Sequence, residues 1–341
     1  MTTLSIASVS ALAAAMALCA GLIVLLFPLL RRYALARPNA RSSHRIPTPQ
    51  GGGIAIIAAT LLVTGAAVAI TPVFGPLSRE LAVVAVCTAI LAVIGAIDDI
   101  RPLDALPRLI LQALIVAALV AALPTALRVI PLLPWWIERA LMVLALVWLV
   151  NLTNFMDGID WITVAEIVPV TAALGVFGLI GALPPDAALI AFALCGATLG
   201  FAPFNRPAAR LFMGDVGSLP IGLLLGWLLV RLAEHHFAAA LLLPLYYLAD
   251  ATITLLRRWR NGEPLATAHR SHFYQRALDS GMPVMAIIRR VILLNVALAG
   301  LAFAVWWMPA LGIPAVVCGG ALVGYVLFSL DRHTGSVAQR S

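Results

Sequence analysis

Polar side chains recur at every third position over a short stretch near the middle of the chain. They are Asn151, Asn154, Asp157 and Asp160. Residues three apart lie roughly on one face of a helix, and amide and carboxylate oxygens are the ligands that Mg²⁺ and Mn²⁺ prefer. Capping of a helix end would account for one of these residues but not for four. The spacing therefore predicts a hard-cation site.

Two adjacent carboxylates, Asp98 and Asp99, stand at the end of a separate apolar segment. Successive side chains on a helix diverge by about 100°, so both can face one ligand only if the helix ends there. A charged carboxylate at the edge of a membrane is costly and indicates a functional site. The alternative interpretation is a solvated helix end that pairs with Arg101 or Arg108.

A third acidic position, Asp215, lies in the string FMGDVGS of residues 212–218. An aspartate between glycines is usually a turn residue. Because this one enters an apolar helix beside another acidic cluster, metal ligation is an equally good interpretation. Asp250 lies deeper, about 10 Å into the membrane from Arg257, and either a function or pairing with a neighbouring helix would explain it.

Residue types that bind anions are gathered in two other segments. His269, Arg270 and His272 suit a pyrophosphate, because arginine binds phosphate oxygens through two parallel hydrogen bonds. A basic cytoplasmic loop would explain the arginines of residues 257–260 but not these histidines. The three glycines of residues 51–53 could bring backbone N–H groups close to an anion, although a flexible start to the next helix is the simpler interpretation.

The composition places these residues in a membrane protein. Of 341 residues, 62% are hydrophobic and 11% are charged, whereas a soluble domain carries about 25% charged residues. We therefore expect residues 1–341 to form a single membrane domain. The first apolar run is too long for a signal peptide and is interpreted as a retained span. The four cysteines lie far apart in apolar runs and indicate neither a disulfide nor a metal site.

Apolar runs of about 20 residues, the length that spans a bilayer, predict an all-α polytopic bundle of about eleven transmembrane helices. The predicted spans are residues 5–30, 52–71, 80–97, 108–124, 135–153, 162–182, 187–204, 218–233, 237–256, 286–307 and 311–330.

An odd number of spans places the two termini on opposite sides of the membrane. All but four of the 22 arginines (Arg79, Arg128, Arg139 and Arg231) fall on the side of the loop after the first span. The positive-inside rule makes that side cytoplasmic, which gives a periplasmic N-terminus and a cytoplasmic C-terminus. The same bias explains the net charge of +7 without a nucleic-acid partner. Five polar loops then share the cytoplasmic face and predict one composite site: residues 31–51, 98–107, 154–161, 205–217 and 257–285.

These motifs together resemble the polyprenyl-phosphate N-acetylhexosamine-1-phosphate transferase superfamily, glycosyltransferase family 4. The strings NFMDGID of residues 154–160 and FMGDVGS of residues 212–218 carry the resemblance, which extends from Arg37 to Arg276. The string HRSHFYQ of residues 269–275 is similar to the branch that starts O-antigen or capsule chains.

The resemblance implies transfer of a sugar-1-phosphate from a UDP-activated N-acetylhexosamine to undecaprenyl phosphate, with release of UMP, which starts a lipid-linked cell-surface glycan such as lipopolysaccharide. It implies a bacterial inner-membrane enzyme that needs Mg²⁺ or Mn²⁺ and has its site on the cytoplasmic face. It gives catalytic roles to Asp98, Asp99 and Asp215, with Asn154 and Asp215 as metal ligands. Substrate-binding roles fall to Ser43, His44, Asp157, Asp160, His269, Arg270 and His272.

Three positions depart from the pattern of that family. Ala36 stands where an acidic residue is usual, and Gln50 replaces a common arginine, which removes one anion contact. Trp161 replaces the usual glycine after Asp160, and its bulk is expected to reshape the nucleotide pocket. None of the three is a proposed metal ligand, so we still expect an active enzyme.

Donor and acceptor are both anionic, so carboxylates gathered around them call for a divalent cation to limit repulsion. A phosphate monoester has a second pKa of about 6 and is largely a dianion at neutral pH. We therefore favour direct attack by the lipid phosphate, with Asp98 positioning it or accepting a residual proton. An aspartyl-phosphate intermediate stays open as the rival mechanism.

A secondary transporter of an anionic solute is the main alternative, since intramembrane carboxylates also mark ion pathways. That class predicts inverted repeats and acidic residues at mid-bilayer, and the sequence shows neither. A non-catalytic scaffold gives no reason for His, Asn and Asp to gather on one face, and the loops lack the acidic motif of CDP-alcohol phosphotransferases. The sequence identifies neither the sugar nor the glycan, and it leaves open whether a homodimer forms.

Overall fold

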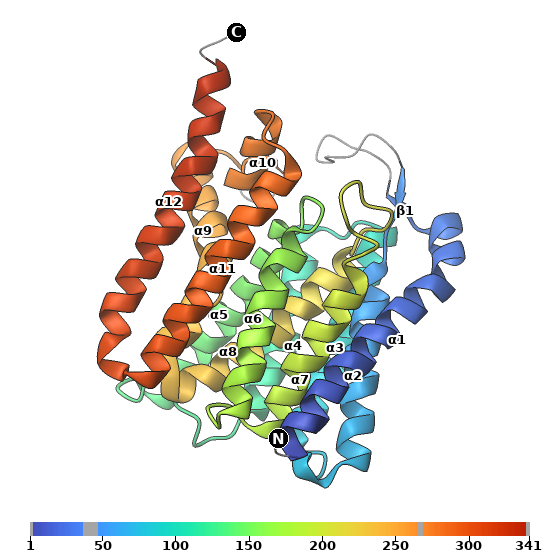
Figure 1. Cartoon of the computed structure of the whole chain (residues 1–341), viewed down its shortest axis with the longest axis vertical. Coiled ribbons are helices and arrows are strands. Elements are labelled where there is room, and N and C mark those ends of the chain that lie inside the picture. Colours follow the sequence, from blue (N-terminus) through green and yellow to red (C-terminus); the bar gives the residue numbers. More distant parts are fainter. Residues whose placement is uncertain (1–2, 37–46, 265–268, 339–341) are drawn as a thin grey trace.

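The computed structural model describes residues 3–36, 47–264 and 269–338, with side chains placed as far as Arg332. The all-α architecture is confirmed: the described part of the chain forms a bundle of twelve α-helices (Figure 1). The helices are α1 (Thr3–Tyr33), α2 (Gly52–Ile70), α3 (Arg79–Ile100), α4 (Ala105–Ala122), α5 (Trp135–Met156), α6 (Ile162–Leu179), α7 (Pro185–Phe201), α8 (Asp215–Leu242), α9 (Leu245–Arg260), α10 (Phe273–Asp279), α11 (Val284–Trp307) and α12 (Gly312–Ala338). Two 3₁₀ turns, η1 (Pro72–Phe74) and η2 (Pro309–Leu311), and a hairpin of β1 (Leu35–Ala36) with β2 (Thr48–Pro49) complete it.

Nine of these helices are long and apolar enough to cross a membrane, counted over the described residues. The sequence predicted about eleven spans. The difference comes from α7, an apolar helix of 17 residues, and from α9, which has 16 residues and several arginines. The start of α1 and the end of α12 lie at opposite ends of the bundle (Figure 1), as an odd number of crossings requires.

The predicted break between the spans 218–233 and 237–256 is only partly present. His236 leaves helical geometry (φ −134°, ψ 56°), but α8 continues beyond this kink to Leu242, and α9 starts at Leu245. The residues after the kink are mostly alanine and leucine, which favour helix. The predicted span 237–256 is therefore divided between the end of α8 and residues 245–256 of α9.

Helix α8 forms the centre of the bundle. It packs against α2, α3, α5, α11 and α12, and most of its length is buried. Helix α1 packs mainly on α7, which is itself almost entirely buried. The hairpin strand β1 and helix α10 lie at the end of the bundle opposite the N-terminus (Figure 1), so the polar connections gather there.

Two buried charged residues hold the connection between α4 and α5. Arg139 donates hydrogen bonds to three main-chain carbonyls at the end of α4 and in the following loop. Glu138 accepts from two backbone N–H groups of that loop and pairs with Arg128. Arg128 also donates to the Leu133 carbonyl, so two of the four arginines assigned to the periplasmic side satisfy backbone groups of this connection.

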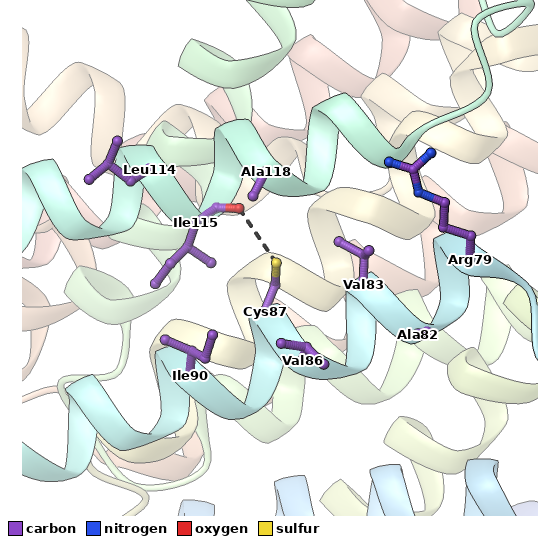
Figure 2. A pocket seen from close by; sticks show the side chains of 9 residues that line it. All are labelled: Arg79, Ala82, Val83, Val86, Cys87, Ile90, Leu114, Ile115 and Ala118. Carbon is purple, nitrogen blue, oxygen red and sulfur yellow. Dashed lines mark hydrogen bonds between the residues drawn. The ribbon is translucent and has the colours of Figure 1, made fainter.

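An apolar groove of about 450 Å³ lies between α3 and α4 (Figure 2). The Cys87 thiol donates to the Ile115 carbonyl across it at 3.6 Å. On α3 the lining ends at Ile90, about 12 Å before Asp98 at 1.5 Å per residue, and it contains no carboxylate or histidine. The lining consists of Arg79, Ala82, Val83, Val86, Cys87, Ile90, Leu114, Ile115 and Ala118.

Candidate active site

Backbone hydrogen bonds join the start of α2 to the segment that precedes α8. The N–H of Phe212 donates to the Pro49 carbonyl, and those of Gly52 and Gly53 donate to the Phe212 and Met213 carbonyls, each at 2.9 Å. These two glycine N–H groups are therefore engaged, and the hypothesis that they face an anion is wrong. The glycines serve close packing instead, because a Cβ on Gly53 would lie 2.2 Å from the Gly217 Cα.

Asp99 caps the N-terminus of α8. Its two carboxylate oxygens accept from the backbone N–H groups of Asp215 at 2.9 Å and Val216 at 3.1 Å. A carboxylate at this place satisfies N–H groups that lack helical partners and complements the helix dipole. Gln50 donates from its side-chain amide to the Asp99 main-chain carbonyl at 2.9 Å, so this departure from the family pattern supports the end of α3.

Asp98 points elsewhere and takes part in a charge network. One of its carboxylate oxygens accepts from the Leu103 N–H and the other from the Arg108 guanidinium, both at 2.6 Å. The same Arg108 nitrogen lies 3.7 Å from a carboxylate oxygen of Asp215. The side chain of Asp98 is 5% exposed and that of Asp215 is 28% exposed, so a ligand reaches Asp215 more readily.

Asn154 lies beside Asp215, as the resemblance implied. Its amide donates to the Asp215 carboxylate at 2.7 Å and to the Ser218 hydroxyl at 2.9 Å. The structure thus brings Asp98, Asn154 and Asp215 together from three separate helices. Sequence reasoning named Arg108 only as a possible partner for a solvated helix end, whereas it lies between two of these carboxylates.

The carboxylate and amide oxygens of this network suit a divalent cation as ligands. Carboxylates of Asp98 and Asp215 both lie within 4 Å of one Arg108 nitrogen, so they already converge on a single positive charge. Carboxylate and amide oxygens are the groups that bind Mg²⁺ and Mn²⁺. Among the residues that the structure describes, no three acidic, histidine or cysteine side chains form a complete metal site, so substrate phosphates would supply further oxygens.

Asp157 and Asp160 lie in the turn after α5 and have different surroundings. Asp157 accepts a hydrogen bond from the Thr163 hydroxyl. Burial raises the pKa of Asp157 to about 6, and the hydrogen bond from Thr163 opposes this shift. Asp160 is buried and accepts from the Ala209 N–H at 3.0 Å, which ties this turn to the α7–α8 connection.

The backbone conformation at Trp161 explains why glycine is usual at this position. Its backbone is left-handed (φ 64°), a conformation that glycine adopts without strain. The N–H of Trp161 donates to the Asn205 side chain at 2.9 Å, and its indole donates to the Ala202 carbonyl at 2.6 Å. The indole therefore points toward the α7–α8 connection, which it helps to fix.

The start of α10 also packs on the end of α5. The Tyr274 hydroxyl donates to the Phe155 carbonyl at 3.3 Å, and burial raises the pKa of Tyr274 well above its usual value, so it stays a neutral donor. His272 stacks on the Tyr274 ring, with 5.7 Å between centroids. Arg270 pairs with Asp279 at 2.6 Å.

The structure does not place every candidate residue. Ser43 and His44 lie outside the described residues. His269 lies within the described residues, and its ring packs beside that of His272 with 5.1 Å between the ring centroids. Tyr274 was not singled out from the sequence. Its position two residues after His272 and its aromatic type were the available signals, but only the fold shows its hydrogen bond to α5.

We expect Asp99→Ala to lower stability by about 0.5–2 kcal/mol, the usual cost of losing a helix N-cap. Transfer activity should fall as well, because Asp99 holds the start of α8 and Asp215 is the first residue of that helix. Thermal unfolding in detergent and initial rates would measure both. Ser78→Ala is a matched control, since Ser78 caps α3 through the Leu81 N–H at 3.0 Å. It should cost similar stability without loss of activity. An inactive Asp99→Ala protein of unchanged stability would contradict the capping role.

Comparison with known proteins adds sequence evidence. A family model described as glycosyl transferase family 4 matches residues 81–233, which include Asp98, Asn154 and Asp215. A decaprenyl-phosphate N-acetylglucosaminephosphotransferase from Mycolicibacterium smegmatis is 30% identical over 335 residues, covering 87% of this chain and 81% of the relative. A phospho-N-acetylmuramoyl-pentapeptide-transferase from Synechococcus sp. is 35% identical over 219 residues, covering 58% and 61%. A Bacillus subtilis protein named "Probable undecaprenyl-phosphate N-acetylglucosaminyl 1-phosphate transferase" is 26% identical over 282 residues, covering 76% and 75%.

Proposed function

Because the chain belongs to glycosyl transferase family 4, we propose that it is a membrane transferase that moves a sugar-1-phosphate from a UDP-N-acetylhexosamine to undecaprenyl phosphate. The names of its relatives support a polyprenyl-phosphate acceptor and an amino-sugar donor. The observation that carries the proposal is the convergence of Asp98, Asn154, Arg108 and Asp215 at the polar end of a multi-pass bundle.

The chemistry is an exchange of phosphoric anhydride bonds. A phosphate oxygen of the lipid attacks the β-phosphorus of the UDP-sugar, and the bond from that phosphorus to the α-phosphate oxygen breaks. UMP leaves, and the product carries a new pyrophosphate between lipid and sugar. Neither water nor an oxidant is consumed, and the lipid phosphate dianion needs no strong base at neutral pH.

The side chains at the site have separable tasks in this reaction. Arg108 provides a positive charge between Asp98 and Asp215, where phosphate oxygens of either substrate can bind. Asp98 orients that guanidinium and accepts any proton that remains on the lipid phosphate. A bound Mg²⁺ or Mn²⁺ held by Asn154 and Asp215 would neutralise phosphate charge. We assign Asp157 to the nucleotide, as the family resemblance implies. Asp160 and Trp161 fix the neighbouring connection.

An aspartyl-phosphate intermediate is the rival mechanism. It requires an accessible carboxylate oxygen: Asp98 uses one oxygen for Leu103 and the other for Arg108, whereas the Asp215 side chain is 28% exposed. We favour direct attack because the lipid phosphate is already largely a dianion at neutral pH. Incubation with donor labelled in its sugar phosphate, without lipid acceptor, would decide: radiolabel retained on the denatured protein would overturn direct attack.

The location and pathway are part of the same proposal. The distribution of arginines supports a bacterial inner membrane with the site on the cytoplasmic face. The string of residues 269–275 favours initiation of a cell-surface glycan of the O-antigen or capsule type.

The direct test incubates purified protein with undecaprenyl phosphate, Mg²⁺ and single UDP-sugars, and measures UMP release together with the lipid-linked product. We expect turnover with at least one UDP-N-acetylhexosamine and little with UDP-glucose, which lacks the acetamido group. UMP without a lipid product would indicate a hydrolase, and no turnover with any UDP-amino sugar would contradict the proposal.

A further inference from the structure

We propose that Asp250 is a positioning residue that holds His272 for contact with the pyrophosphate of the nucleotide-sugar. The inference rests on the proposed function and adds a residue from inside the membrane part of the bundle. Asp250 is 0% exposed on α9, and His272, immediately before α10, is 2% exposed. Their contact, from the His272 Nδ1 to the Asp250 Oδ1, measures 3.0 Å.

Three donors converge on that one carboxylate oxygen. The Phe273 N–H donates at 3.2 Å and the Thr254 hydroxyl at 3.3 Å, beside the His272 ring. The second oxygen of Asp250 is buried without a hydrogen bond among the described residues. A carboxylate removed from water is costly unless a cationic or strongly donating partner faces it. The ring of His272 is the ionisable group that the structure places against it.

This contact determines which ring nitrogen of His272 serves a ligand. A carboxylate that accepts from Nδ1 keeps the proton there, so Nε2 is the nitrogen available for another partner. When the ring carries both protons, Nε2 donates to a phosphate oxygen and the Asp250 carboxylate balances the positive charge. Without Asp250, the ring can rotate or adopt the other tautomer.

The loop that carries His272 is fixed against the candidate active site. His272 stacks on Tyr274, whose hydroxyl binds the Phe155 carbonyl at the end of α5. Gly158 permits this approach, because a Cβ there would lie 2.2 Å from the Tyr274 hydroxyl oxygen. Phe155 follows Asn154 directly in the chain. The ionisable groups around the ring are Asp250, His269 and Tyr274.

A purely structural pair elsewhere in the bundle provides a contrast. Glu166 on α6 is also 0% exposed, and it accepts from the Asn295 amide on α11 at 2.6 Å. This pair joins two long helices and includes no residue of the polar loops. If Asp250 only tethered α9 to α10, its loss should behave like the loss of Glu166.

A double-mutant cycle on transfer activity tests the inference. We expect Asp250→Ala to lower kcat/KM for the UDP-sugar by about 10- to 100-fold, the range for losing a hydrogen bond to a charged group. In a His272→Ala background the same change should cost less than about threefold, because the group it positions is gone. KM for the lipid acceptor should change less than about threefold. Asp250→Asn, which keeps the size and one acceptor oxygen, serves if Asp250→Ala does not fold.

The control and the contrary outcomes are distinct. Glu166→Ala should have the same effect on kcat/KM in the wild-type and His272→Ala backgrounds, whatever its effect on thermal stability. Equal losses for the Asp250 change in both backgrounds would overturn the inference and leave the proposed function intact. An inactive wild-type protein would instead contradict the proposed function itself.

Discussion

Asp98→Asn is expected to reduce kcat by about 10²- to 10⁴-fold, the range associated with removing a positioned acid–base group. The reason is that the change removes the negative charge that orients Arg108 and that accepts a residual proton from the lipid phosphate. Asparagine keeps an oxygen for the Leu103 N–H, so the chain turn after α3 should persist. Initial rates of UMP release at saturating substrates, with thermal unfolding in detergent, would measure the effect.

Asp104→Asn is the matched control for this substitution. Asp104 lies in the same α3–α4 connection but is exposed, and its side chain makes no capping hydrogen bond. Asp104→Asn removes one negative charge, as Asp98→Asn does. If the effect depends on the place of Asp98 and not on net charge, the activity of Asp104→Asn should remain within about threefold of wild type. A fully active Asp98→Asn enzyme would remove Asp98 from the catalytic residues.

Removal of divalent metal is expected to abolish transfer, and added Mg²⁺ or Mn²⁺ to restore it. Two anionic substrates meet two carboxylates, and Arg108 offers a single positive charge against them. Titration of metal into EDTA-treated protein would give the concentration for half-maximal activity. Asp215→Asn should raise that concentration about tenfold or more, since the affinity of such sites depends on the number of charged ligands.

The metal titration has its own control and its own contrary result. Asp104→Asn should follow the wild-type curve, because this carboxylate lies outside the network. Undiminished transfer in protein shown to be metal-free by elemental analysis would exclude a metal requirement, although it would leave the transferase assignment standing.

The sequence was sufficient to predict the bundle and the gathering of polar loops, because both follow from hydrophobic length and arginine distribution. It was not sufficient for the directions of Asp98 and Asp99. Adjacent carboxylates on a helix were expected to point in different directions, but the sequence does not show which partner each one meets. Asp99 accepts from the N–H of Asp215 at the start of α8, a residue 116 positions away, so no local sequence pattern contains this contact.

Other differences have equally specific causes. The glycines at the start of α2 were compatible with an anion or a flexible joint, and only the approach of Gly217 shows that they serve packing. Helix α9 was predicted as part of a span, but it has only 16 residues, and its buried polar side chains have partners within the protein: Asp250 contacts His272, and Arg258 donates to Glu263. The consequences of such long-range contacts lie beyond periodicity and composition.

The backbone pairing between the start of α2 and the segment before α8 also bears on biogenesis. A nascent chain that has inserted only α1 to α7 has made Asp98 but not the helix whose first turn Asp99 stabilises. The carboxylate cluster therefore assembles only once α8 is made, from segments separated by α4 to α7. Chains that stall before α8 should therefore be inert, because they lack Asp215 and the helix start that Asp99 caps.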